Sequence, residues 1–366
     1  MSVIADAPFS AVDAIPDGGP GAPGPDDAPP ALPLSLSRHL PLVDDALRWA
    51  VPATSSPLGK MCSYHLGWVS PDGEPTGGGG GKMLRAALTM WACEACRGEA
   101  EWAVPAAAAV ELIHNFTLIH DDIQDGDATR RHRPTVWAVW GEAQGINAGD
   151  GLFAIAYTAL LAPGPRADRR MRAARSLSQA VLEVIEGQTL DLALEGRPDT
   201  PRATYVRLIT AKTGALLGAC LEMGAILAGA PARTVTKLRN AGRLLGESFQ
   251  MRDDWLGSFG DPDQTGKGRT SDLARRKLTY PVVSAFSRAS YTEQRRLCEL
   301  YADPDAEDGE ELIREILSGL GEPDATAAGA IQTADAAISA VGSSGLDGRW
   351  VDDFAAIARF VAHRTG

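Results

Sequence analysis

Apolar residues recur along most of this chain at the three- and four-residue spacing that places them on one face of a helix. Near the start of the patterned region, the residues assigned to such a face are Leu40, Leu42, Val43, Leu47 and Val51. Comparable stretches cover roughly residues 82–97, 102–126, 146–162, 167–195, 201–228, 232–258 and 279–303, with two or three more toward the end. No convincing β-hairpin and no alternation of strands with helices is visible. The pattern therefore predicts an all-α protein.

The composition fits closely packed helices. Apolar residues make up 45% of the 366 residues, aromatic residues make up only 6%, and alanine is abundant. The net charge of −12 argues against a nucleic-acid-binding surface and against attraction to an anionic membrane. The longest apolar stretch, 215–231, contains Glu222 and several glycines, which predicts an internal helix and not a membrane span. An anionic substrate would therefore need a local cluster of basic residues.

The first 34 residues differ in composition from the rest. They are rich in Pro, Gly, Ala and Asp and contain no Lys or Arg, so they are predicted to be a disordered tail ahead of one folded domain at 35–366. Five cysteines without a secretory leader pattern fit a cytoplasmic location. Cys93 and Cys96 form a lone C-x-x-C, which predicts buried thiols and not a zinc site.

Three carboxylates end one of the apolar helical stretches, in the run H-N-F-T-L-I-H-D-D-I-Q-D-G-D. Asp121 and Asp125 are four residues apart, so a helix places them on one face, where they repel each other unless a cation lies between them. Mg²⁺ suits this position, because it takes oxygen ligands and leaves sites for substrate phosphates. Taken alone, the run is equally typical of a solvated acidic helix end. We call Asp121, Asp122 and Asp125 the first acidic cluster.

A second acidic cluster, Asp253 and Asp254, ends another apolar helical stretch. Two such helix ends can face each other across a bundle and hold two or three Mg²⁺ ions against a diphosphate. Basic residues recur near both clusters, which in a chain of net charge −12 suggests an anionic ligand handled with metals. These residues are Lys82, Arg85, Arg130, Arg131, Lys212, Lys267 and Lys277.

Three further polar residues have both a functional and a structural interpretation. His114 lies two helical turns before Asp121 and could donate to a phosphate oxygen, or it could be a core histidine. Gln188 and Asp191 are one turn apart and could meet a metal-bound ligand, or they could belong to an ordinary polar stripe.

Seven motifs follow one another in a fixed order: G-K-x-x-R, E-L-I-H-N-F-x-L-I-H-D-D-x-x-D, R-R-H-R-P-T, G-Q-x-x-D, K-T-G, F-Q-x-x-D-D and T-G-K. The ordered set resembles the trans-isoprenyl diphosphate synthases of the polyprenyl synthetase family over about residues 40–360. It is most similar to actinobacterial geranylgeranyl diphosphate synthases. The resemblance implies an isoprenoid-synthase-type helical bundle around a central catalytic cavity, usually in a homodimer. It also implies that residues 35–366 form the polyprenyl synthetase catalytic domain.

The resemblance also implies a reaction and residue roles. Isopentenyl diphosphate would condense head-to-tail with dimethylallyl, geranyl or farnesyl diphosphate, and the diphosphate leaving group would be stabilised by metals and cations. Mg²⁺ would be bound by Asp121, Asp125 and Asp253, with Asp122 and Asp254 in support. The allylic diphosphate would be held by Arg130, Lys212 and Lys267, with Thr213 and Gln250 near the developing cation. Isopentenyl diphosphate would be held by Lys82, Arg85, His114 and Arg131.

Product length depends on the helix that leads to the first acidic cluster. Phe116 lies five residues before Asp121, about 7.5 Å along the axis, where its ring could close the floor of the product cavity, while Thr117 is small and leaves room beside it. We expect geranylgeranyl diphosphate as the product, with farnesyl diphosphate as the second choice.

Two departures from the family pattern bear on activity. Gly257 stands where many relatives have a third Asp in the second cluster, so we expect slightly weaker metal binding there. Ala86 replaces the usual Pro after G-K-x-x-R, which is expected to loosen that loop.

Two other functions compete with prenyl transfer. A class I terpene cyclase also uses an aspartate-rich helix and Mg²⁺, but its second metal motif needs a Ser and a Glu where this chain has Gly257 and Asp261. A catalytically silent partner subunit would not need to keep the Asp, Arg and Lys residues. The tail suggests a separate partner: Ile4, Phe9 and Val12 are among the scattered apolar anchors that could dock into an encapsulin protein shell, although an idle solvated extension fits equally well.

Overall fold

The computed structural model describes residues 34–77, 83–131, 133–260 and 271–364. The helices of the N-terminal half are α1 (Leu34–Ser37), α2 (Leu40–Ala50), α3 (Pro57–His65), α4 (Leu84–Ala95), α5 (Ala100–Gln124), α6 (Val136–Trp140), α7 (Glu142–Leu160) and α8 (Ala167–Leu194). Those that follow are α9 (Arg202–Ile209), the π-helix η2 (Thr210–Gly214), α10 (Ala215–Ala228), α11 (Ala232–Phe259), α13 (Tyr280–Phe286), α14 (Tyr291–Ala302), α15 (Gly309–Gly319), α16 (Glu322–Gly342) and α17 (Gly348–His363). The predicted all-α fold is confirmed.

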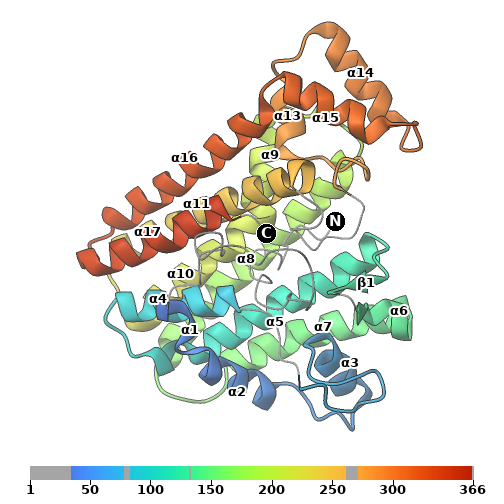
Figure 1. Cartoon of the computed structure of the whole chain (residues 1–366). Coiled ribbons are helices and arrows are strands. Elements are labelled where there is room, and N and C mark those ends of the chain that lie inside the picture. Colours follow the sequence, from blue (N-terminus) through green and yellow to red (C-terminus); the bar gives the residue numbers. More distant parts are fainter. Residues whose placement is uncertain (1–33, 78–82, 132, 261–270, 365–366) are drawn as a thin grey trace, which may run out of the picture.

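Helix α10 occupies the centre of the bundle. It packs against α4 and α5 on one side and α11 on the other, with α8 beside it, and α16 and α17 cover α11 (Figure 1). Small residues allow this close packing. A Cβ at Gly242 of α11 would lie 2.4 Å from the carbonyl oxygen of Leu217, and one at Gly224 would lie 2.3 Å from that of Thr89. The alanine- and glycine-rich composition therefore brings the helices that carry the two acidic clusters onto one central helix.

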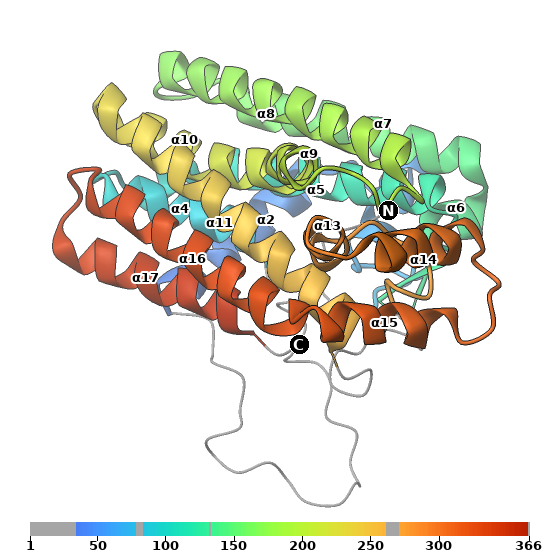
Figure 2. The ribbon, with the colours of Figure 1, turned by 90° about the horizontal axis from the view of Figure 1, so that it is seen from above.

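A second, smaller apolar core lies at the end of the molecule formed by α9, α13, α14 and α15. Tyr205 and Tyr280 are buried in it with ring centroids 6.5 Å apart. Viewed from above, α7 and α8 lie together along one edge of the molecule, away from α16 and α17 (Figure 2). The acidic end of α11 lies where the two cores meet.

The structure differs from the predicted elements in three places. The stretch 201–228 is broken by η2, and the stretch 279–303 is divided because Ser290 caps α14 in a capping box with Glu293. A small antiparallel hairpin joins β1 (Thr129–Arg130) to β2 (Arg133–Pro134). Strands of two residues are too short to show alternation in a sequence.

Two helical stretches, Ala100–Gln124 and Arg202–Ala228, are long and apolar enough to cross a membrane. In each, 83% of the most apolar window is buried inside the protein, as expected for core helices. Cys93 and Cys96 lie at the end of α4, and burial raises the pKa of each thiol to about 12. Cys93 is buried as predicted, whereas Cys96 is only half-buried.

Candidate active site

The first acidic cluster lies at the C-terminal end of α5. The Asp125 N–H donates to the Asp121 carbonyl at 2.9 Å, so the helical geometry continues and the two side chains share a face. Asp121 is only 4% exposed, and its Oδ2 has no hydrogen-bond partner among the described residues. Burial raises the pKa of Asp121, while Lys212 and Arg130 lower it. A buried carboxylate oxygen left without a donor is a ready ligand for a cation.

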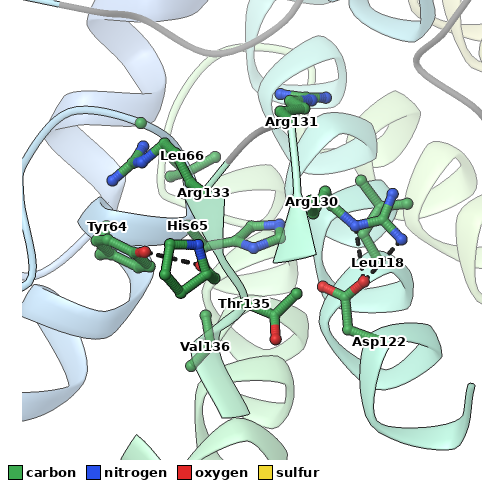
Figure 3. Close-up of a pocket in the computed structure, with 12 residues that line it drawn as sticks. Tyr64, His65, Leu66, Leu118, Asp122, Arg130, Arg131, Arg133, Thr135 and Val136 are labelled. Atoms are coloured by element: carbon green, nitrogen blue, oxygen red, sulfur yellow. Dashed lines mark hydrogen bonds and ion pairs between the residues drawn. The ribbon is translucent and has the colours of Figure 1, made fainter. Parts of the chain in front are cut away.

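Asp122 points in a different direction, toward the hairpin β1–β2. Its Oδ1 accepts from both Nε and Nη2 of Arg130 at 2.7 Å (Figure 3). Burial raises the pKa of Asp122 to about 6, against the lowering effect of Arg130. Asp122 therefore positions Arg130, and its expected support of metal binding stays a prediction.

This ion pair borders a cavity of about 180 Å³ between the end of α3 and the hairpin (Figure 3). Arg131 also lines this cavity, and its backbone adopts the left-handed conformation with a φ of 50°. Arg133 lies over the Tyr64 ring at 4.3 Å and donates to the Val69 carbonyl at 2.9 Å. The cavity is lined by three arginines, Arg130, Arg131 and Arg133, while the anion-binding roles expected of Arg130 and Arg131 stay predictions.

The π-helix η2 places Lys212 and Thr213 between the two acidic clusters. Its widened turn packs against α8, where a Cβ at Gly187 would lie 2.5 Å from the Lys212 nitrogen. Lys212 Nζ is buried and lies 2.7 Å from Asp191 Oδ2. The Thr213 hydroxyl donates to Gln250 Oε1 at 2.9 Å. The two adjacent residues thus have different partners. Lys212 bonds to Asp191 and lowers the pKa of Asp121, while Thr213 bonds to Gln250 of α11.

Asp254 in the second cluster is fully satisfied by donors from the protein. Its Oδ2 accepts from the Tyr205 hydroxyl at 2.6 Å and the Tyr280 N–H at 2.8 Å, and its Oδ1 accepts from Gln250 Nε2 at 2.8 Å. Burial raises the pKa of Asp254 to about 7, and these hydrogen bonds oppose the rise. Asp254 therefore orients Gln250, and a direct role as metal ligand is left to Asp253.

Asp253 pairs with a residue that sequence analysis missed. Arg364, which caps the C-terminal end of α17, donates from Nη2 to Asp253 Oδ1 at 2.9 Å. The Arg364 side chain is only 1% exposed, and its backbone carbonyl accepts from Arg252 Nε at 2.7 Å. Nothing in the sequence marks this contact, since the two partners lie 111 residues apart. Tyr205 was also missed, because it carries no charge and lies outside every motif.

The remaining predicted residues are distributed as follows. Arg85 on α4 and His114 on α5 are both buried, on two helices that pack together. Gln188 donates to Gln124 Oε1 at 2.8 Å, which joins α8 to the end of α5. Lys82 and Lys267 lie outside the described residues, so their roles stay predictions.

Ala86 lies in the first turn of α4, whereas residues 78–82 of the loop that it was expected to loosen lie outside the described residues. The Ala86 N–H donates to the buried Glu111 carboxylate at 2.9 Å, a bond that proline could not make. Ala86 is itself fully buried. The substitution therefore ties the first turn of α4 to α5.

Phe116 and Thr117 lie on the buried side of α5. The Phe116 ring packs edge-on against Phe153 of α7, with centroids 5.5 Å apart, and against His120 at 4.9 Å. The Thr117 hydroxyl donates to the His114 carbonyl at 2.7 Å. The ring at 116 is thus backed by a second aromatic side chain and has little freedom to move.

Comparison with known proteins decides the family. Residues 75–318 match the family model described as polyprenyl synthetase. The chain belongs to the polyprenyl synthetase family. It is 45% identical over 260 residues to a geranylgeranyl diphosphate synthase of Mycobacterium tuberculosis, covering 71% of this chain and 74% of the relative. It is 41% identical over 251 residues to a (2E,6E)-farnesyl diphosphate synthase of Mycobacterium bovis, covering 68% of each.

Solved structures of the polyprenyl synthetase family share the fold. A polyprenyl synthetase from Streptomyces coelicolor is similar with a TM-score of 0.83 and 39% identity over 90% of this chain and 99% of that one. A polyprenyl synthase from Caulobacter crescentus, complexed with calcium and isoprenyl diphosphate, has a TM-score of 0.79 and 28% identity over 91% and 98%. These findings confirm the predicted isoprenoid-synthase-type fold. Together with the family match, they show that this protein is a trans-prenyltransferase.

The donor set suits a hard cation that is shared with a substrate. In the part of the chain that the structure describes, no three His, Cys, Asp or Glu side chains converge closely enough to hold a metal ion. Mg²⁺ normally takes one or two carboxylates and completes its octahedron with waters and phosphate oxygens. Asp121, whose buried Oδ2 receives no hydrogen bond from any described residue, fits that requirement.

The Asp253–Arg364 pair leads to a stability prediction. Replacing Arg364 by Met leaves the Asp253 carboxylate buried without its cation, so the free energy of unfolding should fall by about 3–5 kcal/mol. Chemical denaturation followed by circular dichroism in EDTA measures the change. Arg359→Met, at an exposed position of the same helix, is the control. An equal free energy of unfolding for Arg364→Met and Arg359→Met would show that the Asp253–Arg364 pair does not stabilise the fold.

Proposed function

We propose that this protein is a Mg²⁺-dependent trans-prenyltransferase whose main product is geranylgeranyl diphosphate, with farnesyl diphosphate as the alternative. The observation that carries the proposal is the buried Asp121 Oδ2, which has no hydrogen-bond donor in the described part of the chain and lies near the buried cation Lys212. Isopentenyl diphosphate and an allylic diphosphate are the substrates that the relatives' names and the motif order support.

Asp121, Asp125 and Asp253 would hold two or three Mg²⁺ ions. Bound Mg²⁺ supplies Lewis-acid stabilisation of the diphosphate as it leaves the allylic carbon. The Caulobacter relative is complexed with calcium and isoprenyl diphosphate, which supports a divalent cation as part of the proposal. Lys212 and Arg130 would add positive charge at positions that are fixed before the substrate binds. The Asp191 carboxylate holds Lys212, and the Asp122 carboxylate holds Arg130.

Thr213 and Gln250 would face the allylic cation with oxygen atoms. Gln250 accepts at Oε1 from the Thr213 hydroxyl and donates from Nε2 to Asp254, and these two bonds fix the orientation of its amide. The Thr213 oxygen keeps its lone pairs available because its proton is directed at Gln250. Both oxygens thus present negative partial charge at a buried position from which water is largely excluded.

The product length is proposed from the aromatic stack below the first acidic cluster. Phe116 rests on Phe153, which in turn packs against Tyr157 with centroids 5.2 Å apart. Such a stack resists displacement by a growing hydrocarbon chain. Relatives that make the twenty-carbon and the fifteen-carbon product are 45% and 41% identical, so identity alone does not separate the two lengths.

A homodimer is proposed from the exposed apolar stripe on α7 and α8. The stripe consists of Ile146, Phe153, Met171, Leu182, Ile185 and Leu192. Both helices lie along one edge of the molecule (Figure 2), and on α8 the side chains recur at helical spacing. A self-complementary stripe of this kind suits a two-fold interface with a second copy. Phe153, 37% exposed, would then connect the product floor to the partner.

A cytoplasmic location and docking of residues 1–34 into an encapsulin shell also remain proposals. Most of that tail lies outside the described residues. Co-expression with a shell, with and without residues 1–34, tests the docking, and equal co-purification of both forms contradicts it.

Incubation with Mg²⁺, isopentenyl diphosphate and each allylic diphosphate tests the activity. We expect elongation; a cyclic hydrocarbon would indicate a cyclase, and no product would indicate a silent subunit. Asp121→Asn should lower kcat/KM roughly a thousandfold, equivalent to about 4 kcal/mol. Asp352→Asn, at an exposed position of α17, serves as the matched control. Full activity of Asp121→Asn would refute the assignment.

Phe116→Ala should lengthen the product, because it removes the ring that closes the cavity. Chromatography of the prenyl chains after dephosphorylation measures the distribution. Phe286→Ala, in the second core, controls for a general loss of packing. An unchanged distribution would rule out Phe116 as the floor.

Leu182→Glu combined with Ile185→Glu should convert the dimer to a monomer, since two charges on each copy would be buried in the interface. Light scattering coupled to size-exclusion chromatography gives the mass. Tyr291→Glu, exposed on α14 outside the stripe, is the control. A monomeric wild type would contradict the homodimer.

A further inference from the structure

Position 257, where many relatives have a third Asp of the second acidic cluster, is a glycine in this chain. Gly257 lies one helical turn after Asp253 on α11 and is buried. A side chain at this position would share a face with Asp253, with the two Cβ atoms about 5–6 Å apart. Any carboxylate found there is within reach of a cation that Asp253 also binds.

The carboxylate of Asp272 occupies that place. Its Oδ2 lies 1.8 Å from the position that a Cβ would take at Gly257, and its Cγ and Cβ lie 2.6 and 3.3 Å away. The three nearest atoms to that position all belong to this one side chain. A residue larger than glycine at 257 would therefore have to displace the Asp272 carboxylate.

The backbone fixes Asp272 in this position. Its N–H donates to the Gly257 carbonyl at 3.1 Å, and its carbonyl accepts from the Lys277 N–H at 3.0 Å. Asp272 also contributes, with Asp254 and Asp191, to the negative charge that raises the pKa of the buried Tyr205, although burial is the larger cause. The Asp272 carboxylate thus belongs to the electrostatic environment of the second acidic cluster.

Arg364 gives independent evidence that an anionic ligand binds beside Asp253. Its guanidinium is buried and donates to Asp253 through Nη2 alone. Its Nε and Nη1 are buried with no hydrogen-bond partner among the described residues. Buried guanidinium donors of this kind suit phosphate oxygens. Carboxylates for a cation and donors for a diphosphate therefore lie at one place.

We propose that Asp272 supplies the third carboxylate of the second acidic cluster and, with Asp253, binds a Mg²⁺ ion that a substrate diphosphate shares. Two carboxylates, diphosphate oxygens and waters complete the octahedral set that Mg²⁺ requires. In this proposal, the third carboxylate comes from Asp272 and not from a side chain at position 257. This inference rests on the proposed Mg²⁺-dependent function.

Moving the carboxylate back to position 257 tests the inference. Calorimetry measures Mg²⁺ binding to the full chain in the presence of inorganic pyrophosphate. Asp272→Ala and the isosteric Asp272→Asn should both weaken the affinity about ten- to a hundredfold. Gly257→Asp combined with Asp272→Ala should restore it to near the wild-type value, because removing the Asp272 side chain frees the space. Asp352→Ala should bind as the wild type does.

The outcomes separate this inference from the proposed function. Wild-type affinity in Asp272→Ala would overturn the inference while leaving the proposed function intact. Weakened binding that Gly257→Asp does not restore would also overturn it, since Asp272 would then act only in folding. Thermal unfolding in EDTA checks that each variant is folded. A wild type that binds no Mg²⁺ with pyrophosphate would overturn the proposed function and this inference together.

Discussion

Burial of carboxylates inside a helical bundle is the constraint on which this site depends. Asp121, Asp253 and Asp254 are all nearly inaccessible, and an uncompensated charge at such positions would be strongly destabilising. The protein compensates each one differently. Asp254 accepts three hydrogen bonds, and Asp253 accepts one from the Arg364 guanidinium. Lys212 lowers the pKa of Asp121, whose Oδ2 has no donor within the ranges that the structure describes. The number of protein donors to each buried carboxylate thus distinguishes Asp254, which orients Gln250, from the candidate metal ligands Asp121 and Asp253.

Helix η2 couples the two clusters. Lys212 and Thr213 are neighbours in the chain, yet one affects Asp121 and the other binds Gln250, which holds Asp254. A regular α-helix would place consecutive side chains about 100° apart on a narrower turn. The π-helical turn packs on Gly187 of α8, with Lys212 bonded to Asp191 of α8 and Thr213 bonded to Gln250 of α11. The residues proposed for leaving-group binding and for cation stabilisation therefore lie on one helical turn.

Helical periodicity and motif order were enough to predict the all-α fold and the two acidic clusters, because those signals are local. The shared face of Asp121 and Asp125 follows directly from a four-residue spacing. The partners of the second cluster could not be predicted, since Arg364 and Asp272 reach it only through tertiary folding. For the same reason the sequence did not show that the Asp272 carboxylate lies where a side chain at position 257 would be, or that the Ala86 N–H donates to the Glu111 carboxylate.

The central claim is that the two acidic clusters act as one unit on one diphosphate. A double-mutant cycle on kcat/KM for isopentenyl diphosphate addition, using Asp121→Asn, Asp253→Asn and the double variant, measures this directly. If the clusters share one metal–diphosphate assembly, the double variant should be hardly slower than the slower single variant. Losses that multiply, so that the two free-energy costs add, would show independent sites and contradict the account.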